Sequence, residues 1–256
     1  MLTASMRMLP NFLIIGAQKS GTTSLYSHLA KHPCVGAAFE KEVRYFNDHY
    51  AKGVNWYKAH FPMRRIGSKL ITGEGEPSYL PNPVAAERVL ELLPEVKLIV
   101  MLRNPVDRAY SHYQHRFTRD REQRSFEEVC ATDKETLKDG WENLPTEDYI
   151  RLGHSYYSYL PRGFYYEQLR NWLAVFPKDR FLIIKAEDFF AETQEGYDDV
   201  LAFLDLPEHR LEQRKRHNVG KYAKPMSDET RQDLADYFRP HNQQLYDLLD
   251  RDFGWS

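Results

Sequence analysis

Cysteine, long apolar runs and an excess of charge of one sign are all scarce in this sequence. The 256 residues include two cysteines, Cys34 and Cys130, far apart in the chain, so no disulfide framework is indicated and a reducing compartment is favoured. The formal net charge of −2 gives no general attraction to nucleic acid or anionic membranes. Apolar stretches such as Leu98–Leu102 are too short to span a bilayer, and no signal-peptide core precedes the first expected strand. We therefore expect a cytoplasmic protein with no membrane insertion and no nucleic-acid partner.

The chain also lacks internal repeats, low-complexity segments and any long polar stretch that would read as a linker. Hydrophobic residues make up 42% and charged residues 28%, which is typical of a globular protein. A chain of this length can bury a substantial core. The composition therefore predicts one domain over residues 1–256.

Short apolar runs alternate with segments of helical spacing. The runs Asn11–Gly16, Val96–Leu102 and Arg180–Lys185 are typical of parallel strands buried on both faces. A last helical stretch, Ser227–Leu249, is expected to be interrupted near Pro240. The other expected helices are Thr22–Lys31, Pro83–Leu93, Pro105–Phe117, Ser125–Lys138, Leu160–Phe176 and Tyr197–Leu204. The pattern predicts an α/β fold of three layers, similar to the P-loop NTPases, with a central parallel sheet flanked by helices.

A glycine-rich segment, Gly16-Ala-Gln-Lys-Ser-Gly21, lies between the first expected strand and the first expected helix. Such a loop wraps phosphates with backbone N–H groups, and the helix dipole adds partial positive charge. A simple tight turn is the alternative, but the position of Lys19 and of Thr22 and Thr23 at the opening of the helix favours phosphate binding. We call residues 16–21 the phosphate loop.

The phosphate loop departs from the ATP-binding motif G-x-x-x-x-G-K-[ST]. Thr22 follows the second glycine, and the lysine lies earlier, at position 19. The strand Leu98–Leu102 ends in Arg103, which can bind a phosphate, where many ATPases carry an aspartate that helps to hold Mg²⁺. The sequence therefore favours a phosphorylated nucleotide bound without a magnesium bridge, and an atypical P-loop kinase becomes a minor alternative.

Seven segments, in order along nearly the whole chain, resemble the sulfotransferase superfamily, in particular the bacterial sulfotransferases and the heparan sulfate glucosaminyl sulfotransferases. The segments are GAQKSGTTSL (Gly16–Leu25), FEKEVRYF (Phe39–Phe46), GVNWYKAHFP (Gly53–Pro62), GEGEPSYL (Gly73–Leu80), LIVMLRNPVDRAYSHY (Leu98–Tyr113), GFYYEQLRNWLAVFP (Gly163–Pro177) and NVGKYAKPMSDETRQDLADYF (Asn218–Phe238). The resemblance implies an enzyme that transfers a sulfuryl group from 3′-phosphoadenosine-5′-phosphosulfate (PAPS) to an acceptor hydroxyl, releasing adenosine 3′,5′-bisphosphate (PAP), without a metal.

The resemblance also implies which residues bind the donor. Its 5′-phosphosulfate would lie against Lys19, Ser20, Gly21, Thr22 and Thr23, and its 3′-phosphate against Arg103 and Ser111. Lys19 would neutralise charge on the bridging oxygen as the sulfuryl group leaves. A late loop, His217–Pro225, resembles the family's cover over the nucleotide, which places Lys221 and Tyr222, and with less support Lys224, among the candidate donor contacts. For either lysine alone, a solvated basic turn is the alternative.

The resemblance assigns the general base to Glu42, which would accept the proton of the acceptor hydroxyl. A charged surface turn is the alternative, since Glu40 and Lys41 are beside it. Two departures from the family also leave open a non-catalytic nucleotide-binding module. Arg44 replaces a histidine, and Gly75 stands where the heparan enzymes have a lysine that assists transfer.

The acceptor is an alcohol or a sugar whose identity the sequence does not define. Extra acid in Gly73–Leu80 disfavours a polyanionic acceptor such as heparan. The segment Arg116–Arg124 mixes charges and is expected to form a solvated helix end, with a mobile lid over the acceptor as the alternative. The histidine pairs at positions 28 and 32 and at 112 and 115 lack a third ligand, so no metal site is expected.

Overall fold

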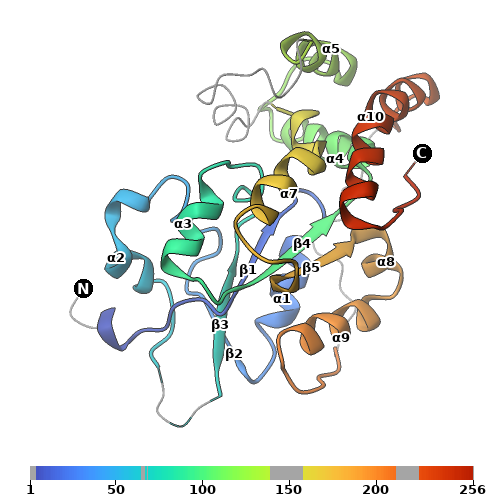
Figure 1. Cartoon of the computed structure of the whole chain (residues 1–256). Coiled ribbons are helices and arrows are strands. Elements are labelled where there is room, and N and C mark those ends of the chain that lie inside the picture. The colour runs from blue at the N-terminus through green and yellow to red at the C-terminus, as the bar shows by residue number, and fades with distance from the viewer. Residues whose placement is uncertain (1–3, 65–66, 68, 139–157, 212–224, 256) are drawn as a thin grey trace.

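A five-stranded parallel sheet forms the centre of the molecule, in the order β2-β3-β1-β4-β5 (Figure 1). The computed structural model describes residues 4–64, 67, 69–138, 158–211 and 225–255. The strands are β1 (Phe12–Gly16), β2 (Val35–Ala37), β3 (Ile71–Gly75), β4 (Lys97–Leu102) and β5 (Phe181–Lys185). The predicted α/β fold with a central parallel sheet is confirmed, and its strands β1, β4 and β5 match the three apolar runs.

Helices connect the strands and cover both faces of the sheet (Figure 1). They are α1 (Thr22–Leu29), α2 (Val54–Lys58), α3 (Ala85–Leu92), α4 (Pro105–Phe117), α5 (Phe126–Thr136), α7 (Tyr165–Leu173), α8 (Ala186–Ala191), α9 (Thr193–Phe203) and α10 (Asp228–Leu249). Short 3-10 turns are η1 (Ala4–Met6), η2 (Tyr50–Lys52), η4 (Pro161–Gly163) and η5 (Lys178–Arg180). The expected helix over residues 160–176 is therefore shorter, because η4 replaces its first turn.

The two faces of the sheet follow from the alternation of side chains along each strand. Leu13 and Ile15 of β1 pack with Trp172 of α7 in one apolar cluster. Phe12 and Ile14, pointing the other way, pack in a second cluster with residues of α1, α8 and α9. Because both faces are covered, the inner strands are apolar throughout, which is why their sequences are continuous hydrophobic runs.

A third apolar cluster lies beyond the carboxyl end of the sheet, between α4, α5, the segment 158–164 and the first half of α10. The expected interruption of the last helix near Pro240 is wrong, because α10 continues through this proline. Proline removes one backbone hydrogen bond of the helix. Buried Phe238 and Leu245, on either side of it, hold the helix against the rest of the molecule.

The order of the strands gathers the functional segments at one edge. All five strands run in the same direction, so the residues after β1, β2, β3 and β4 emerge at the same carboxyl edge of the sheet. The chain passes from β1 to β2 and β3 on one side and then to β4 and β5 on the other. Ligands of open α/β sheets bind at such a reversal of strand order.

Candidate active site

The phosphate loop joins β1 to α1 in a conformation that depends on glycine. Gly21 precedes the first residue of α1 with a φ of 98°, in the left-handed region. A Cβ added there would lie 2.5 Å from the Phe190 ring, so any side chain would clash as well as strain the backbone. The Ala17 amide donates to the Met101 carbonyl of β4 at 2.7 Å, which fixes the start of the loop to the sheet.

Polar groups of the phosphate loop are oriented for an anion. The first amides of an α-helix, here those of Thr22 and Thr23, have no carbonyl of a preceding turn as acceptor. Ser20 is fully buried, and among the described residues its hydroxyl has no hydrogen-bond partner. A buried hydroxyl without a partner costs free energy. An anion bound inside the loop would satisfy the hydroxyl and the amides together.

Lys19 is at the centre of a group of positive charges. Burial, the largest cause, and repulsion by neighbouring cations together lower the pKa of its ammonium to about 8. These cations are Arg119, Arg103, Arg108 and Lys41. These charges come from the end of β4, from α4 and the turn after it, and from the loop after β2. Mutual repulsion within such a group is relieved when a polyanion binds.

Arg103 and Ser111 follow β4, as the sequence predicts. Arg103 donates a hydrogen bond to the Lys19 carbonyl at 3.3 Å, so it lies against the phosphate loop. The Tyr165 hydroxyl donates to the Arg103 carbonyl at 2.9 Å and holds this segment against α7. Ser111 lies eight residues further along, buried in α4. The two predicted donor contacts therefore come from one strand end and the helix that follows it.

Two buried arginines of this region were not found from the sequence. Arg162 of η4 donates to the Gln18 side chain of the phosphate loop at 2.9 Å. Arg108 of α4 is fully buried and donates to the Tyr159 carbonyl. Arg108 lies within the segment LIVMLRNPVDRAYSHY and could have been selected with Arg103, whereas Arg162 is close to the loop only through folding. His112, buried in the same region, has a pKa well below its ordinary value because of burial and the neighbouring arginines.

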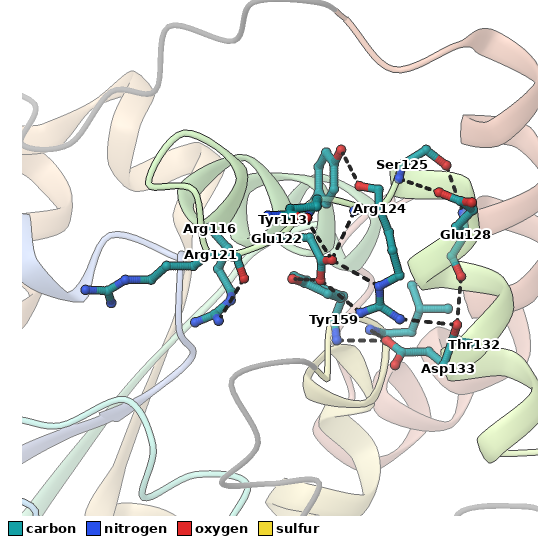
Figure 2. Close-up of polar contacts among 12 residues, drawn as sticks. Tyr113, Arg116, Arg121, Glu122, Arg124, Ser125, Glu128, Thr132, Asp133 and Tyr159 are labelled. Carbon is teal, nitrogen blue, oxygen red and sulfur yellow. Dashed lines mark hydrogen bonds and ion pairs between the residues drawn. The ribbon is translucent and has the colours of Figure 1, made fainter.

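A polar network fixes the segment that carries Arg119 (Figure 2). Glu122 accepts hydrogen bonds from Arg124 at 2.9 Å and from the Tyr159 hydroxyl at 2.9 Å. These donors, Arg124 first, hold the pKa of the Glu122 carboxyl at about 2. Asp133 of α5 accepts the amides of Tyr159 and Leu160 at 2.8 and 2.7 Å.

The segment 116–124 is largely exposed, as expected from its charges, but two of its charged residues are not. Arg116 and Glu122 are both buried, and Arg116 donates to the Arg121 carbonyl at 3.2 Å. In Figure 2, Arg116 and Arg121 extend away from the group around Glu122. Anchoring by Glu122 places the exposed Arg119 where its charge reaches Lys19.

The candidate base Glu42 lies beside the phosphate loop. The Lys41 ammonium donates to the Thr23 hydroxyl at 2.7 Å and to the Glu42 carboxylate at 2.6 Å. Thr23 is the second residue of α1, so Lys41 connects the base to the helix that opens the loop. The structure thus brings Glu42, Thr23 and Lys19 into one region, and it adds Lys41, which the sequence did not single out.

Buried carboxylates lie behind the base. Glu76 is almost fully buried, accepts from the Ser78 hydroxyl at 2.6 Å, and has the Arg44 guanidinium 3.7 Å away. Glu74 accepts the hydroxyls of Tyr57 and Tyr79, each at 2.8 Å. Since both carboxylates face the interior, their charge is not presented to an acceptor. The expectation that extra acid here disfavours a polyanionic acceptor therefore loses its basis.

Lys221 and Tyr222, together with Lys224, lie outside the described residues, so their contact with a donor stays a prediction. Within the described ranges, no group of three or more histidine, cysteine, aspartate or glutamate side chains is arranged to hold a metal. In the same part of the chain, no helix combines the length and the apolar character needed to cross a bilayer.

The fold and the loop together define a class: a P-loop-like α/β protein with a candidate anion site at the carboxyl edge of its parallel sheet. The family model described as the sulfotransferase domain matches residues 9–240. The chain belongs to this family, which confirms the resemblance seen in the sequence.

The chain is similar to several sulfotransferases. The chain is 30% identical to "Membrane-associated sulfotransferase kil1" of Dictyostelium discoideum, over 97% of this chain and 67% of that protein. It is 32% identical to "Bifunctional heparan sulfate N-deacetylase/N-sulfotransferase 3" of Homo sapiens, over 94% of this chain but 30% of that protein. A solved sulfotransferase structure from Alicyclobacillus acidocaldarius superposes with a TM-score of 0.79 at 28% identity, over 96% of this chain and 98% of that one.

Proposed function

We propose that this protein transfers a sulfuryl group from PAPS to the hydroxyl of an alcohol or a sugar. Lys19 and residues 20–23 would bind the phosphosulfate, Arg103 and Ser111 the 3′-phosphate, and Glu42 would act as the base. The family of the chain supports sulfuryl transfer, and the site supports this donor.

The observation that carries the proposal is the group of cations around Lys19. They lie near a loop whose buried Ser20 hydroxyl has no hydrogen-bond partner within the described ranges. PAPS carries its charge at two separated positions, the phosphosulfate and the 3′-phosphate. The site offers more than one positive charge for such a ligand, on Lys19 of the phosphate loop and on Arg103, which follows β4 and contacts the loop. A single monoanion would leave part of this charge uncompensated.

The reaction would balance without further reactants. The acceptor oxygen attacks sulfur, and its proton passes to the Glu42 carboxylate. The bond between sulfur and the bridging oxygen breaks, and PAP leaves with the electron pair. Lys19, protonated, stabilises the charge that develops on that oxygen. In the absence of ligand its pKa of about 8 keeps most of it protonated at neutral pH, and the charge of a bound donor would raise this pKa further.

Isothermal titration with PAP tests the donor assignment. The wild type is expected to bind PAP without magnesium, and Arg103→Ala is expected to weaken binding by roughly a factor of ten or more, because it removes a charge-assisted contact with phosphate. Arg239→Ala, which changes an exposed arginine of α10, is the matched control and should bind as the wild type does. Tight binding of ATP–Mg²⁺ without PAP binding would instead support the kinase alternative.

Glu42→Gln tests the base. The substitution keeps the shape of the side chain but removes the proton acceptor, so transfer from radiolabelled PAPS to a library of hydroxyl acceptors should fall by roughly a hundredfold or more. PAP affinity should stay nearly unchanged. Donor binding by the wild type without transfer to any acceptor in the library would favour the non-catalytic module.

A further inference from the structure

Lys41 makes two contacts that join different parts of the site. Its ammonium lies 2.7 Å from the Thr23 hydroxyl on α1 and 2.6 Å from a Glu42 carboxylate oxygen. The side chains of Lys41 and Glu42 are each about one-third exposed, so the pair lies at the edge of the site. The contact with Thr23 does not follow from the sequence, because Thr23 and Lys41 are 18 positions apart.

The chemistry of the contact with Thr23 fixes the direction of its hydroxyl. An ammonium group has three donors and no acceptor, so Thr23 must accept from Lys41. The hydrogen of the Thr23 hydroxyl is then directed to a different acceptor. Thr23 is in the first turn of α1, where the backbone amides have no acceptor within the helix and can donate to an anion. The contact with Lys41 thus leaves the hydrogen of the Thr23 hydroxyl to be donated to another acceptor, which a bound anion would provide.

The contact with Glu42 uses one of the two carboxylate oxygens. In the part of the chain that the structure describes, Lys41 donates a hydrogen bond to Oε1 of Glu42, and Oε2 accepts none. The second oxygen is therefore available to accept a proton from an acceptor hydroxyl. The orientation of the carboxylate is set by Lys41 while its second oxygen stays accessible.

An exposed ion pair between neighbouring residues would by itself be worth little. Here the backbone of the turn that carries Glu42 is held in an unusual conformation next to the Lys41–Glu42 ion pair. Glu42 and Arg44 both have left-handed φ values, 63° and 57°, which residues other than glycine rarely adopt. Buried Val43 between them and the Arg44–Glu76 ion pair hold this turn in place. Strained residues held by their surroundings are typical of functional sites.

We propose that Lys41 is a positioning residue that couples donor binding to the placement of the base, by holding the Thr23 hydroxyl toward the donor and the Glu42 carboxylate toward the acceptor. The inference rests on the proposed function, since it takes the donor site and the base as given. It adds to that function a residue through which binding of the donor affects the position of the base.

The donor half is tested by titrating PAP into Lys41→Met, Lys41→Arg and Thr23→Val. Lys41→Met and Thr23→Val should each weaken PAP binding by roughly a factor of ten, and Lys41→Arg should recover most of the loss because it keeps the charge and two donors. The double variant should be no weaker than the poorer single variant, because both changes remove one interaction. Lys31→Met, at an exposed lysine after α1, is the charge-matched control and should bind normally.

The base half is tested by following sulfate release from PAPS with water as the acceptor. Lys41→Met should lower kcat by roughly tenfold or more at saturating PAPS, and Lys41→Met combined with Glu42→Gln should be no slower than Glu42→Gln alone. If the wild type releases no measurable sulfate, crystal structures of the wild type and Lys41→Met with PAP bound test the position of the base instead. The Glu42 carboxylate should then have moved away from Thr23 in Lys41→Met.

Two results would overturn the inference. The first is a PAP affinity of Lys41→Met equal to that of the wild type. The second is a fall in kcat caused by Glu42→Gln that is as large in the Lys41→Met background as in the wild type. In the crystals, the equivalent result is a Glu42 carboxylate that has not moved. If the wild type itself binds no PAP, the proposed function fails instead, so the two failures are distinguishable.

Discussion

At the scale of single residues, burial determines which charges the molecule can tolerate. Glu74 lies within β3, fully enclosed, with the hydroxyls of Tyr57 and Tyr79 as donors. Burial raises the pKa of this carboxyl to about 7, although both hydroxyls lower it. The loss of hydration thus exceeds the gain from two hydrogen bonds, and Glu74 is partly protonated at neutral pH.

Glu74→Gln is expected to flatten the dependence of stability on pH. Because the pKa of Glu74 is raised by folding, from 4.5 to about 7, its contribution to stability is complete below pH 4.5 and is lost as pH rises through 7. The loss amounts to something on the order of 3 kcal/mol in the free energy of unfolding. Glutamine keeps an oxygen for both tyrosines and has no charge to bury. Urea unfolding at pH 5 and pH 8 measures the change, with Glu87→Gln on the exposed face of α3 as control. An equal loss in wild type and Glu74→Gln would contradict the assignment.

At the scale of elements, α5 holds the chain that leads into η4. The Asp133 carboxylate accepts two consecutive amides, those of Tyr159 and Leu160, and so acts as a clamp between the helix and this segment. Arg162 follows immediately and reaches the phosphate loop. The clamp therefore determines where one of the cations of the site lies.

Asp133→Asn and Asp133→Ala should separate the clamp from its charge. Burial raises the pKa of Asp133 from 3.8 to about 6, so ionisation costs stability at neutral pH. Asparagine keeps the accepting oxygen, and we expect it to be neutral or stabilising at pH 7. Alanine leaves two buried amides without an acceptor and should destabilise by roughly 3 kcal/mol. Urea unfolding with Glu135→Ala, an exposed change on α5, as control distinguishes these outcomes. Equal destabilisation by asparagine and alanine would mean that the charge itself is required.

At the scale of the whole molecule, sequence reasoning recovers what is local or strongly patterned. The strands β1, β4 and β5 are evident because burial on both faces requires continuous apolar runs. The strands β2 and β3 are not, because Val35–Ala37 is short and Ile71–Gly75 contains two glycines and Glu74. Glu74 is tolerated in a buried strand only because Tyr57 and Tyr79, from other segments, supply donors.

The residues of the candidate site also divide into those that the sequence predicts and those that it does not. The phosphate loop and Arg103 could be predicted because strand, turn and helix follow one another in the chain. The roles of Lys41 and Arg162 could not, since each depends on contacts between segments distant in sequence. The net charge of −2 likewise conceals the local group of cations around Lys19.

The order of the strands has a consequence for how such a protein can change over time. The proposed base, Glu42, follows β2 on the side of β2 and β3, whereas Arg103 and Ser111 follow β4 on the other side of β1. Under the proposed function, the recipient of the sulfuryl group is selected mainly by one half of the sheet and the nucleotide by the other. Substitutions can then accumulate in the first half while the second half keeps its ligand. A lineage with this arrangement can acquire new recipients without losing its donor.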